Sequence, residues 1–368
     1  MRPESLQFLR TLLDTPSPSG FERDGQRVWL EYVKSNGATR TWNDAYGNCF
    51  AELAPTEPAA GPRGTPFTVA VCGHADEIGV MVNHIDSNGF VWCRAIGGID
   101  AGSIVGKRLN FRSSVPGVSN PVPGLIGATA IHLQDRTGEP KVRKMHELFV
   151  DIGAANEAEA RARLNIGDPG TFMDSSMMLG EHLIVARALD NRIGTWVAAE
   201  TLRLCARMPS RNVRVVAVST VQEEVGLHGA SMIAESLRPD VALVTDVGHA
   251  TDSPGITHAQ HGQFKVGAGP KIALGGAMQP EVTARLLETA QRLDIPLQRA
   301  ATPGSSGTDT DSIFLAGGGI ASGLLSFPIR YMHTTVEMGD LRDLERIPQV
   351  FAGFCDGLDA SARFAPAL

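Results

Sequence analysis

The sequence contains few cysteines, few aromatic residues and no long apolar run. The five cysteines are scattered, odd in number and without any CxxC spacing. This arrangement argues against a disulfide framework or a thiolate zinc knuckle, and it favours a reducing compartment. No apolar run approaches the roughly 18 residues that a membrane span needs, and the first residues lack the sustained apolar core of a signal peptide. We therefore expect a cytoplasmic protein that has no membrane partner.

Long stretches of positive charge are also missing. Lys and Arg together number 33 and Asp and Glu number 40, which gives a formal net charge of −7. No run of basic residues is long enough to follow a phosphate backbone, so nucleic acid is not an expected partner. A mildly acidic surface of this kind mainly serves solubility.

The composition that is present is that of a globular chain with a sizeable core. Hydrophobic residues make up 43% and charged residues 20% of the 368 positions, and this length favours two structural units. In the second half, apolar runs at 213–218, 241–244 and 320–325 alternate with helical patterns. Strands that alternate with helices indicate an α/β fold with a mainly parallel sheet flanked by helices.

A different pattern interrupts this α/β alternation near residue 78. Short strand-like pieces follow, separated by turns that contain Gly or Pro, with one helical stretch near 156–164. Such a pattern is typical of a small β-rich unit. We therefore expect a discontinuous catalytic domain of residues 1–75 and 171–368, with a β-rich domain of residues 76–170 inserted into it.

Imidazoles and carboxylates follow the expected strands of the catalytic part or precede its helices. In open α/β sheets, ligands bind at the carboxyl ends of the strands, so these side chains are expected to converge there. Divalent ions such as zinc, cobalt or manganese bind to this mixture of nitrogen and oxygen donors. The candidate residues are His74, Asp76, Asp190, Glu223, Glu224, Asp246 and His333.

Each candidate also has a purely structural explanation. Asp190 precedes a helix and could be its N-cap, and an aspartate such as Asp246 at a strand end often closes a turn. The pair Glu223–Glu224 could be a solvated surface feature, and a single histidine after a strand is more often a hydrogen-bonded structural residue. Their shared position at strand ends favours a metal site over these separate explanations.

Several motifs that contain the candidates occur in a fixed order along the chain. They are Gly73–Gly79, Ala188–Arg192, Val221–Gly226, Asp246 and His333–Met338. In this order they resemble the M42 metallo-aminopeptidases, which include glutamyl aminopeptidases and tetrahedral aminopeptidases. The resemblance extends over nearly the whole chain, and it implies an α/β catalytic domain interrupted by a small β domain used for dimerisation.

The resemblance also implies a metal centre with two divalent ions, zinc or cobalt, with manganese as an alternative. Asp190 is similar to the carboxylate that bridges the two ions. His74 and Asp246 resemble the further ligands of one ion, and Glu224 and His333 those of the other.

Two further residues have roles that the resemblance implies. Glu223 is similar to the general base of the family, and Asp76 to the residue that supports the metal-binding His74. The expected reaction is the removal of N-terminal residues from short peptides by attack of metal-activated water. Members of the family form dimers and twelve-subunit tetrahedral particles, so the same self-association is expected here.

Two other functions remain open at this point. Some family members have been labelled endoglucanases, and a glycoside hydrolase needs a pair of carboxyl groups but no metal. However, sugar clefts favour aromatic platforms, and the chain has only four Trp and three Tyr. A non-catalytic assembly protein that retains the fold is the third hypothesis, which the complete set of candidate ligands disfavours.

Overall fold

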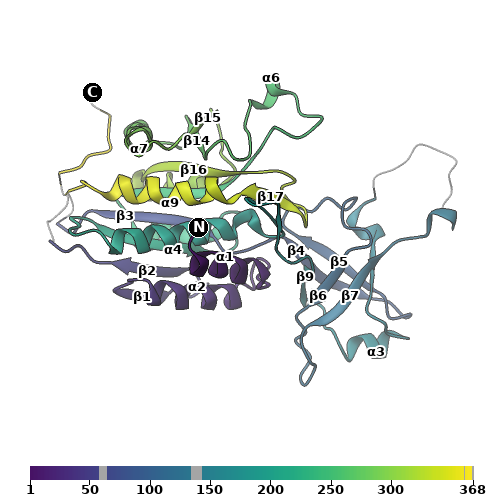
Figure 1. Ribbon diagram of the computed structural model, residues 1–368. Helices are drawn as coiled ribbons and strands as arrows, with labels where there is room; N and C mark the ends of the chain where they lie inside the picture. The colour runs from purple at the N-terminus through teal and green to yellow at the C-terminus, as the bar shows by residue number, and fades with distance from the viewer. Residues whose placement is uncertain (58–63, 134–142, 360, 367–368) are drawn as a thin grey trace.

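The chain folds into two parts, an α/β part and a β-barrel (Figure 1). The computed structural model describes residues 1–57, 64–133, 143–359 and 361–366. The chain leaves the α/β part after strand β3 (Thr68–His74) and returns to it after strand β9 (Pro169–Phe172). The division into a catalytic and an inserted domain at 75/76 and 170/171 stays a prediction.

The α/β part is built on an eight-stranded sheet with the order β1-β2-β12-β3-β13-β16-β14-β15. The four central strands β12, β3, β13 and β16 run parallel, whereas β2 and β14 pair antiparallel with their inner neighbours. The expected α/β class is confirmed, but the sheet is parallel only at its centre and mixed as a whole. The other strands of this sheet are β1 (Arg40–Asn43), β2 (Cys49–Leu53), β12 (Arg214–Thr220), β13 (Val241–His249), β14 (Lys271–Leu274), β15 (Gln298–Ala301) and β16 (Ala321–Ile329).

Helices cover both faces of this sheet because its central strands are apolar on both sides. In β3, Val69 and Val71 join one hydrophobic cluster, and Ala70 and Cys72 join the other. Helices α1 (Pro3–Asp14), α2 (Arg23–Ser35), α4 (Leu189–Ala206), α7 (Pro280–Arg292) and α9 (Leu341–Cys355) pack on the first face. Helices α5 (His228–Leu237) and α8 (Thr310–Ile313) pack on the second, and the short helices α6 (His258–His261) and η3 (Ala316–Gly318) lie in connecting segments.

The barrel is closed by six antiparallel strands in the order β4-β5-β8-β7-β6-β9. It has a hydrophobic core of its own, to which Val80, Leu109, Phe111 and Val150 contribute. The helix expected near 156–164 is shorter than the sequence pattern suggests. The remaining elements of this part are β4 (Gly79–Ile85), β5 (Val91–Ile96), β6 (Arg108–Phe111), β7 (Val122–Gly127), η1 (Ile131–Leu133), η2 (Met145–Glu147), β8 (Phe149–Asp151) and α3 (Glu157–Arg161).

A separate three-stranded sheet connects the site to the end of the chain. It consists of β10 (Met177–Leu179), β11 (Leu183–Ala186) and β17 (Glu337–Asp340), in that order. Strand β11 leads directly into α4, and β17 leads directly into α9. The segments at residues 187–190 and 330–336 are therefore held close together, because they flank two paired strands.

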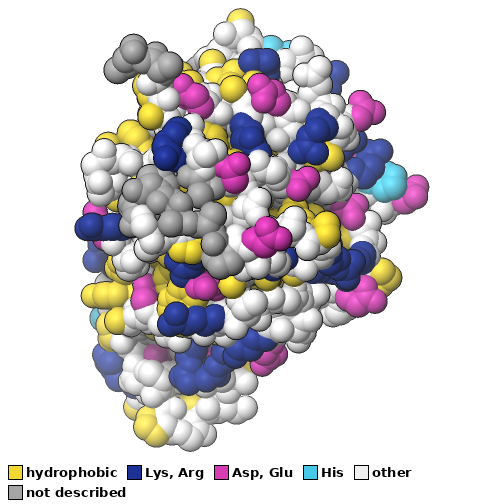
Figure 2. Space-filling model, turned by 90° about the vertical axis from the view of Figure 1, so that its left-hand side faces the viewer, with side chains coloured by type: hydrophobic (Ala, Val, Ile, Leu, Met, Phe, Trp, Pro, Cys, Tyr) yellow, Lys and Arg dark blue, Asp and Glu magenta, His cyan; other side chains and the backbone are white. Residues whose placement is uncertain are grey.

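Charges of both signs are interspersed on the face of the molecule shown in Figure 2, where Lys and Arg side chains alternate with Asp and Glu. Within the described parts of the chain, no helix combines the length and the apolar character that crossing a membrane requires. All five cysteines are free and buried, as expected from their spacing.

Candidate metal centre

The five predicted ligands come from five separate segments that meet at one edge of the central sheet. His74 is the last residue of β3, and Asp246 lies in the second half of β13. Asp190 lies at the start of α4, and Glu224 lies in the turn after β12. His333 lies in the loop between β16 and β17. This edge carries the carboxyl ends of the parallel strands, where ligands bind in open α/β sheets.

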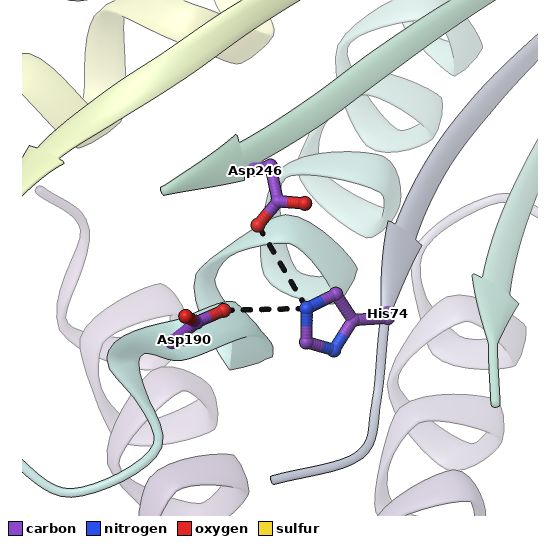
Figure 3. Close-up of side chains that lie close together, drawn as sticks. All are labelled: His74, Asp190 and Asp246. Carbon is purple, nitrogen blue, oxygen red and sulfur yellow. Dashed lines mark ion pairs between the residues drawn. The ribbon is translucent and has the colours of Figure 1, made fainter. Parts of the chain in front are cut away.

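The first group consists of His74, Asp190 and Asp246 (Figure 3). The Nε2 atom of His74 lies 3.2 Å from Oδ1 of Asp190 and 3.8 Å from Oδ1 of Asp246. One ligand atom from each residue lies within 4.8 Å of the others. All three residues are buried, so their charges interact in a poorly hydrated environment.

The second group consists of Asp190, Glu224 and His333. The Nε2 atom of His333 lies 3.4 Å from Oδ2 of Asp190 and 3.5 Å from Oε2 of Glu224. Asp190 therefore belongs to both groups, with one carboxylate oxygen next to each imidazole. The structure thus brings together all five residues that the sequence analysis selected as ligands, while their role in binding metal stays a prediction.

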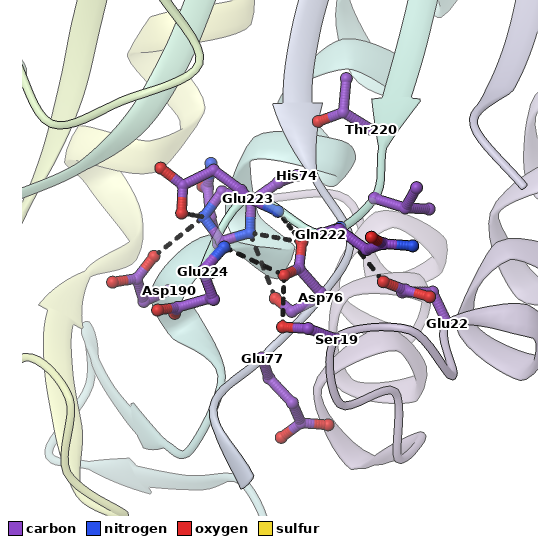
Figure 4. A network of polar contacts seen from close by, with 12 residues as sticks. Ser19, Glu22, His74, Asp76, Glu77, Asp190, Thr220, Gln222, Glu223 and Glu224 are labelled. Carbon is purple, nitrogen blue, oxygen red and sulfur yellow. Dashed lines mark hydrogen bonds and ion pairs between the residues drawn. The ribbon is translucent and has the colours of Figure 1, made fainter. Parts of the chain in front are cut away.

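Asp76 holds this edge together through four polar contacts (Figure 4). Its carboxylate accepts hydrogen bonds from Ser19 Oγ at 2.7 Å and from the backbone N–H groups of Glu223 and Glu224 at 3.0 and 3.1 Å. Its Oδ1 also lies 3.3 Å from Nδ1 of His74. The imidazole therefore presents Nε2 to the other carboxylates, because Asp76 occupies the opposite side of the ring.

Two buried glutamates that the sequence analysis did not select hold the backbone of the site. Glu337 accepts hydrogen bonds from the backbone N–H of Asp190 at 3.0 Å and from that of His333 at 2.9 Å. Glu22 accepts one from the backbone N–H of Gln222 at 3.1 Å. Gln222 and His333 both have left-handed backbones, with φ of 57° and 59°, which is strained for residues with a side chain. The only signal for Glu337 was its place inside the His333–Met338 motif.

Crowding of the acidic groups changes their protonation. Burial and the neighbouring Asp190 raise the pKa of Glu224 to about 10, and burial raises the pKa of Asp246 as well. Burial also raises the pKa of Glu223, to about 7. For Asp190, hydrogen bonds from His333 and His74 outweigh the effect of burial and lower the pKa to about 2. Several carboxylates thus cannot ionise together here without more positive charge than two imidazoles supply.

The donor set fits divalent cations of the zinc and cobalt class. Imidazole nitrogens and carboxylate oxygens are their ordinary ligands, and each group offers both. In addition, Oε1 of Glu224 is buried and has no hydrogen-bond partner among the residues that the structure describes, although a buried polar atom normally has one. A cation between the carboxylates would supply both the missing partner and the missing positive charge.

A cavity of about 570 Å³ opens from this edge of the sheet. Among the residues that line it are His74, Asp190, Glu223, Glu224, Asp246 and His333. The other lining residues include Lys271, His249 and small or apolar residues of β13, β14, β15 and β16, together with the loop at 302–308. The loop with Ser306 and Thr308 therefore lies at the site.

His249 also lines the cavity, whereas His228, which lies close in sequence to Glu224, does not. The ring of His228 instead lies with Nδ1 3.3 Å from the side-chain oxygen of Gln222. Among the described residues, no Trp or Tyr lines the cavity, so it offers none of the large aromatic platforms on which sugar rings stack.

Comparison with known proteins agrees with this geometry. A family model described as M42 glutamyl aminopeptidase matches residues 59–350. The chain is 35% identical over 360 residues to the putative aminopeptidase FrvX of Escherichia coli K12, and the alignment covers 97% of this chain and 96% of that protein. The crystal structure of a TET aminopeptidase from a marine sediment archaeon, Thaumarchaeota archaeon SCGC AB-539-E09, matches with a TM-score of 0.88 and 27% identity.

That structure and this chain cover each other almost completely, at 98% and 97% of their respective lengths. The structure of PhTET1-12s, described as a dodecamer, matches 97% of this chain and 100% of its own, with a TM-score of 0.82 and 26% identity. The resemblance inferred from the motifs is confirmed over most of the chain. The protein belongs to the M42 glutamyl aminopeptidase family and is an enzyme that hydrolyses peptide bonds.

Proposed function

We propose that the protein is a dinuclear-metal aminopeptidase that removes N-terminal residues from peptides, with Glu223 as its general base. The observation that carries the proposal is the position of Asp190, which belongs to both ligand groups and directs one oxygen at each imidazole. A carboxylate shared in this way is what a two-metal site needs as a bridge.

Each of the two ligand groups would hold one of the two proposed ions. His74 and Asp246 would hold one ion, Glu224 and His333 the other, and Asp190 both. Zinc or cobalt suits these donors, and manganese is an alternative. When bound, such a pair of ions polarises a peptide carbonyl and makes water more acidic.

Glu223 is suited to move protons because it lies at the cavity but belongs to neither ligand group. Its Oε2 lies 3.6 Å from His74 Nε2, and Asp76 holds its backbone N–H. In the proposed reaction, Glu223 takes a proton from water while the water oxygen bonds to the carbonyl carbon. The C–N bond then breaks, and Glu223 gives the proton to the departing amine nitrogen.

The two rival functions fit the site less well. A glycoside hydrolase uses a pair of carboxyl groups and has no need for imidazoles between them. Here, each of the two ligand groups contains a histidine. A binding protein without activity has no need for Glu223, which lies among the ligands without being part of either group. The aminopeptidase uses every residue of the cluster.

Self-association through the barrel is part of the proposal. The related PhTET1-12s is described as a dodecamer, and exposed apolar side chains on and beside this barrel include Val105, Leu125 and Met173. We infer that the inserted domain of residues 76–170 forms the dimer contact and that dimers assemble further. Light scattering coupled to size-exclusion chromatography measures the particle mass.

The substitution Glu223→Gln tests the assignment of the base. The variant is expected to keep two ions per subunit by elemental analysis and to lose about 10²–10⁴-fold in turnover of aminoacyl substrates, the range of general acid–base catalysis. Glu235→Gln, at an exposed glutamate of α5, is the matched control with unchanged turnover. If Glu223→Gln retains its metal and its activity stays near that of the wild type, the base is a different residue.

A further inference from the structure

The turn that follows strand β5 of the barrel lies against the second ligand group. Gly97 and Gly98 come directly after β5, which is a strand of the barrel. A Cβ added to Gly97 would lie 3.1 Å from Oε2 of Glu224, and one added to Gly98 would lie 2.7 Å from Nδ1 of His333. Gly98 also lines the cavity. Two consecutive residues of the barrel thus contact two candidate ligands that belong to the α/β part.

Gly98 provides the space that the ring of His333 occupies. An added Cβ would lie 2.7 Å from Nδ1 and 3.1 Å from Cε1 of this ring, whereas non-bonded heavy atoms normally lie about 3.5–4.0 Å apart. The backbone of Gly98 is not left-handed, so alanine could adopt it without strain. The missing side chain, and not an unusual backbone, is therefore what this position requires.

Gly97 is required for two reasons. Its φ of 72° lies in the left-handed region, which glycine adopts at no steric cost. A Cβ at this position would also lie 2.8 Å from Cγ2 of Ile78 on one side and 3.1 Å from Oε2 of Glu224 on the other. The backbone of the turn therefore passes between an apolar side chain and the carboxylate.

The imidazole of His333 has less support within the α/β part than that of His74. The side chain of His74 is 1% exposed, and Asp76 lies on the Nδ1 side of its ring. The side chain of His333 is 37% exposed. A hydrogen bond with Asp190 raises the pKa of His333, and a hydrogen bond with the backbone of Gly98 acts in the same direction. Gly98 therefore supports one ring as Asp76 supports the other.

The two ligand groups consequently differ in how they are held. His74 and Asp246 lie in β3 and β13, which pair with each other in the central sheet. Glu224 and His333 lie in connecting segments of the α/β part, with the barrel turn against their side chains. A shift of this turn would move the ligands of the second group and leave those in the sheet in place.

We propose that Gly97 and Gly98 are positioning residues through which the barrel holds Glu224 and His333 in place for the second ion. Binding of that ion depends on the barrel, and binding of the ion at His74 and Asp246 does not. This inference rests on the proposed two-metal function, and it gives the barrel a role in the metal centre besides self-association.

Stepwise removal of zinc from the loaded Gly98→Ala variant tests the proposal. A chromogenic chelator that competes for zinc measures the two dissociation constants. One ion is expected to bind about 10- to 100-fold more weakly than in the wild type, the range for loss of a group that supports a metal ligand, while the other binds as before. His333→Ala should weaken the same ion and so identifies it.

Gly304→Ala is the matched control. It adds the same methyl group to a backbone that is not left-handed, at a position where no atom of the described residues lies within 4 Å of the new Cβ. Both dissociation constants should equal those of the wild type.

The double variant Gly98→Ala/His333→Ala separates positioning from general disruption. With the ring removed, the new methyl group has room, so this variant should fold and bind zinc as His333→Ala alone does. This comparison holds even if Gly98→Ala alone does not fold.

Three results would overturn the proposal. They are wild-type affinity for both ions in Gly98→Ala, equal weakening of both ions, and a double variant that binds zinc more weakly than His333→Ala or does not fold. A wild-type protein that binds fewer than two ions per subunit would instead overturn the proposed dinuclear site.

Discussion

Acidic and basic side chains line the same cavity. Four carboxylates surround the Nε2 atoms of two histidines. Lys271 also lines this cavity, and its Nζ has the Phe264 ring and the carbonyl oxygen of His249 as neighbours.

The sequence identified the ligands more readily than their supports. His74, Asp190 and Asp246 follow or flank strongly apolar segments, and that context is visible in a single chain. Lys271 lies in a four-residue strand next to the edge strand of the sheet, and Glu337 lies in a four-residue strand of the separate sheet. Their place beside the site depends on strand register, which a short segment does not encode by itself.

At the scale of elements, the site depends on the close approach of β3 and α4. Gly73, next to His74, faces Gly194 of α4, and a Cβ added to Gly73 would lie 2.4 Å from the carbonyl carbon of Gly194. Only backbone can occupy this contact. The two glycines therefore allow a strand that ends in one candidate ligand to lie against the helix that begins with another.

Gly73→Ala is expected to weaken the protein and its metal site together. The methyl group meets backbone atoms that cannot rotate away, so β3 and α4 must separate. We expect a loss of about 1–3 kcal/mol in the free energy of unfolding, as for other overpacked cores, and weaker metal binding because His74 and Asp190 move apart. Denaturant unfolding and metal titration measure the two effects.

Gly304→Ala is the control for this substitution, since a Cβ there meets nothing within 4 Å. It should change neither quantity by a comparable amount. If Gly73→Ala kept the stability and the metal affinity of the wild type, the close packing of these two elements would not be what positions the ligands.

Pairing with neighbouring strands explains why the sequence pattern predicted some strands to be shorter than they are. The apolar run at 241–244 continues as strand to His249, because Thr245 to His249 pair with β16 although their sequence is partly polar. Asp246 therefore lies inside a strand and not after one. Strands β1, β14 and β15, at or next to the edges of the sheet, have four residues each, which is too few for a periodic signal. Three antiparallel pairings toward the edges make the sheet mixed.

At the scale of the whole molecule, a network of ion pairs connects the start of the barrel to the α/β part. Glu77, between β3 and β4, bonds to Arg187 and Arg192 and accepts from the backbone N–H of Ser17. Glu77 also forms an isolated bridge with Pro18. The barrel is therefore anchored beside the candidate metal centre, since Asp76 is the residue that precedes Glu77.

Removal of metal is expected to lower both the activity and the thermal stability of the protein. The cluster holds more carboxylates than imidazoles, and without cations their repulsion opposes folding. An ion that binds only the folded state at about 100 times its dissociation constant adds about 2.7 kcal/mol, so a chelator should lower Tm by roughly 5–10 °C. Zinc or cobalt added back in excess should restore both quantities, and chelator saturated with zinc beforehand is the control. A glycoside hydrolase that works through carboxyl groups alone would keep its activity in the chelator, so an enzyme indifferent to this treatment would contradict the dinuclear site.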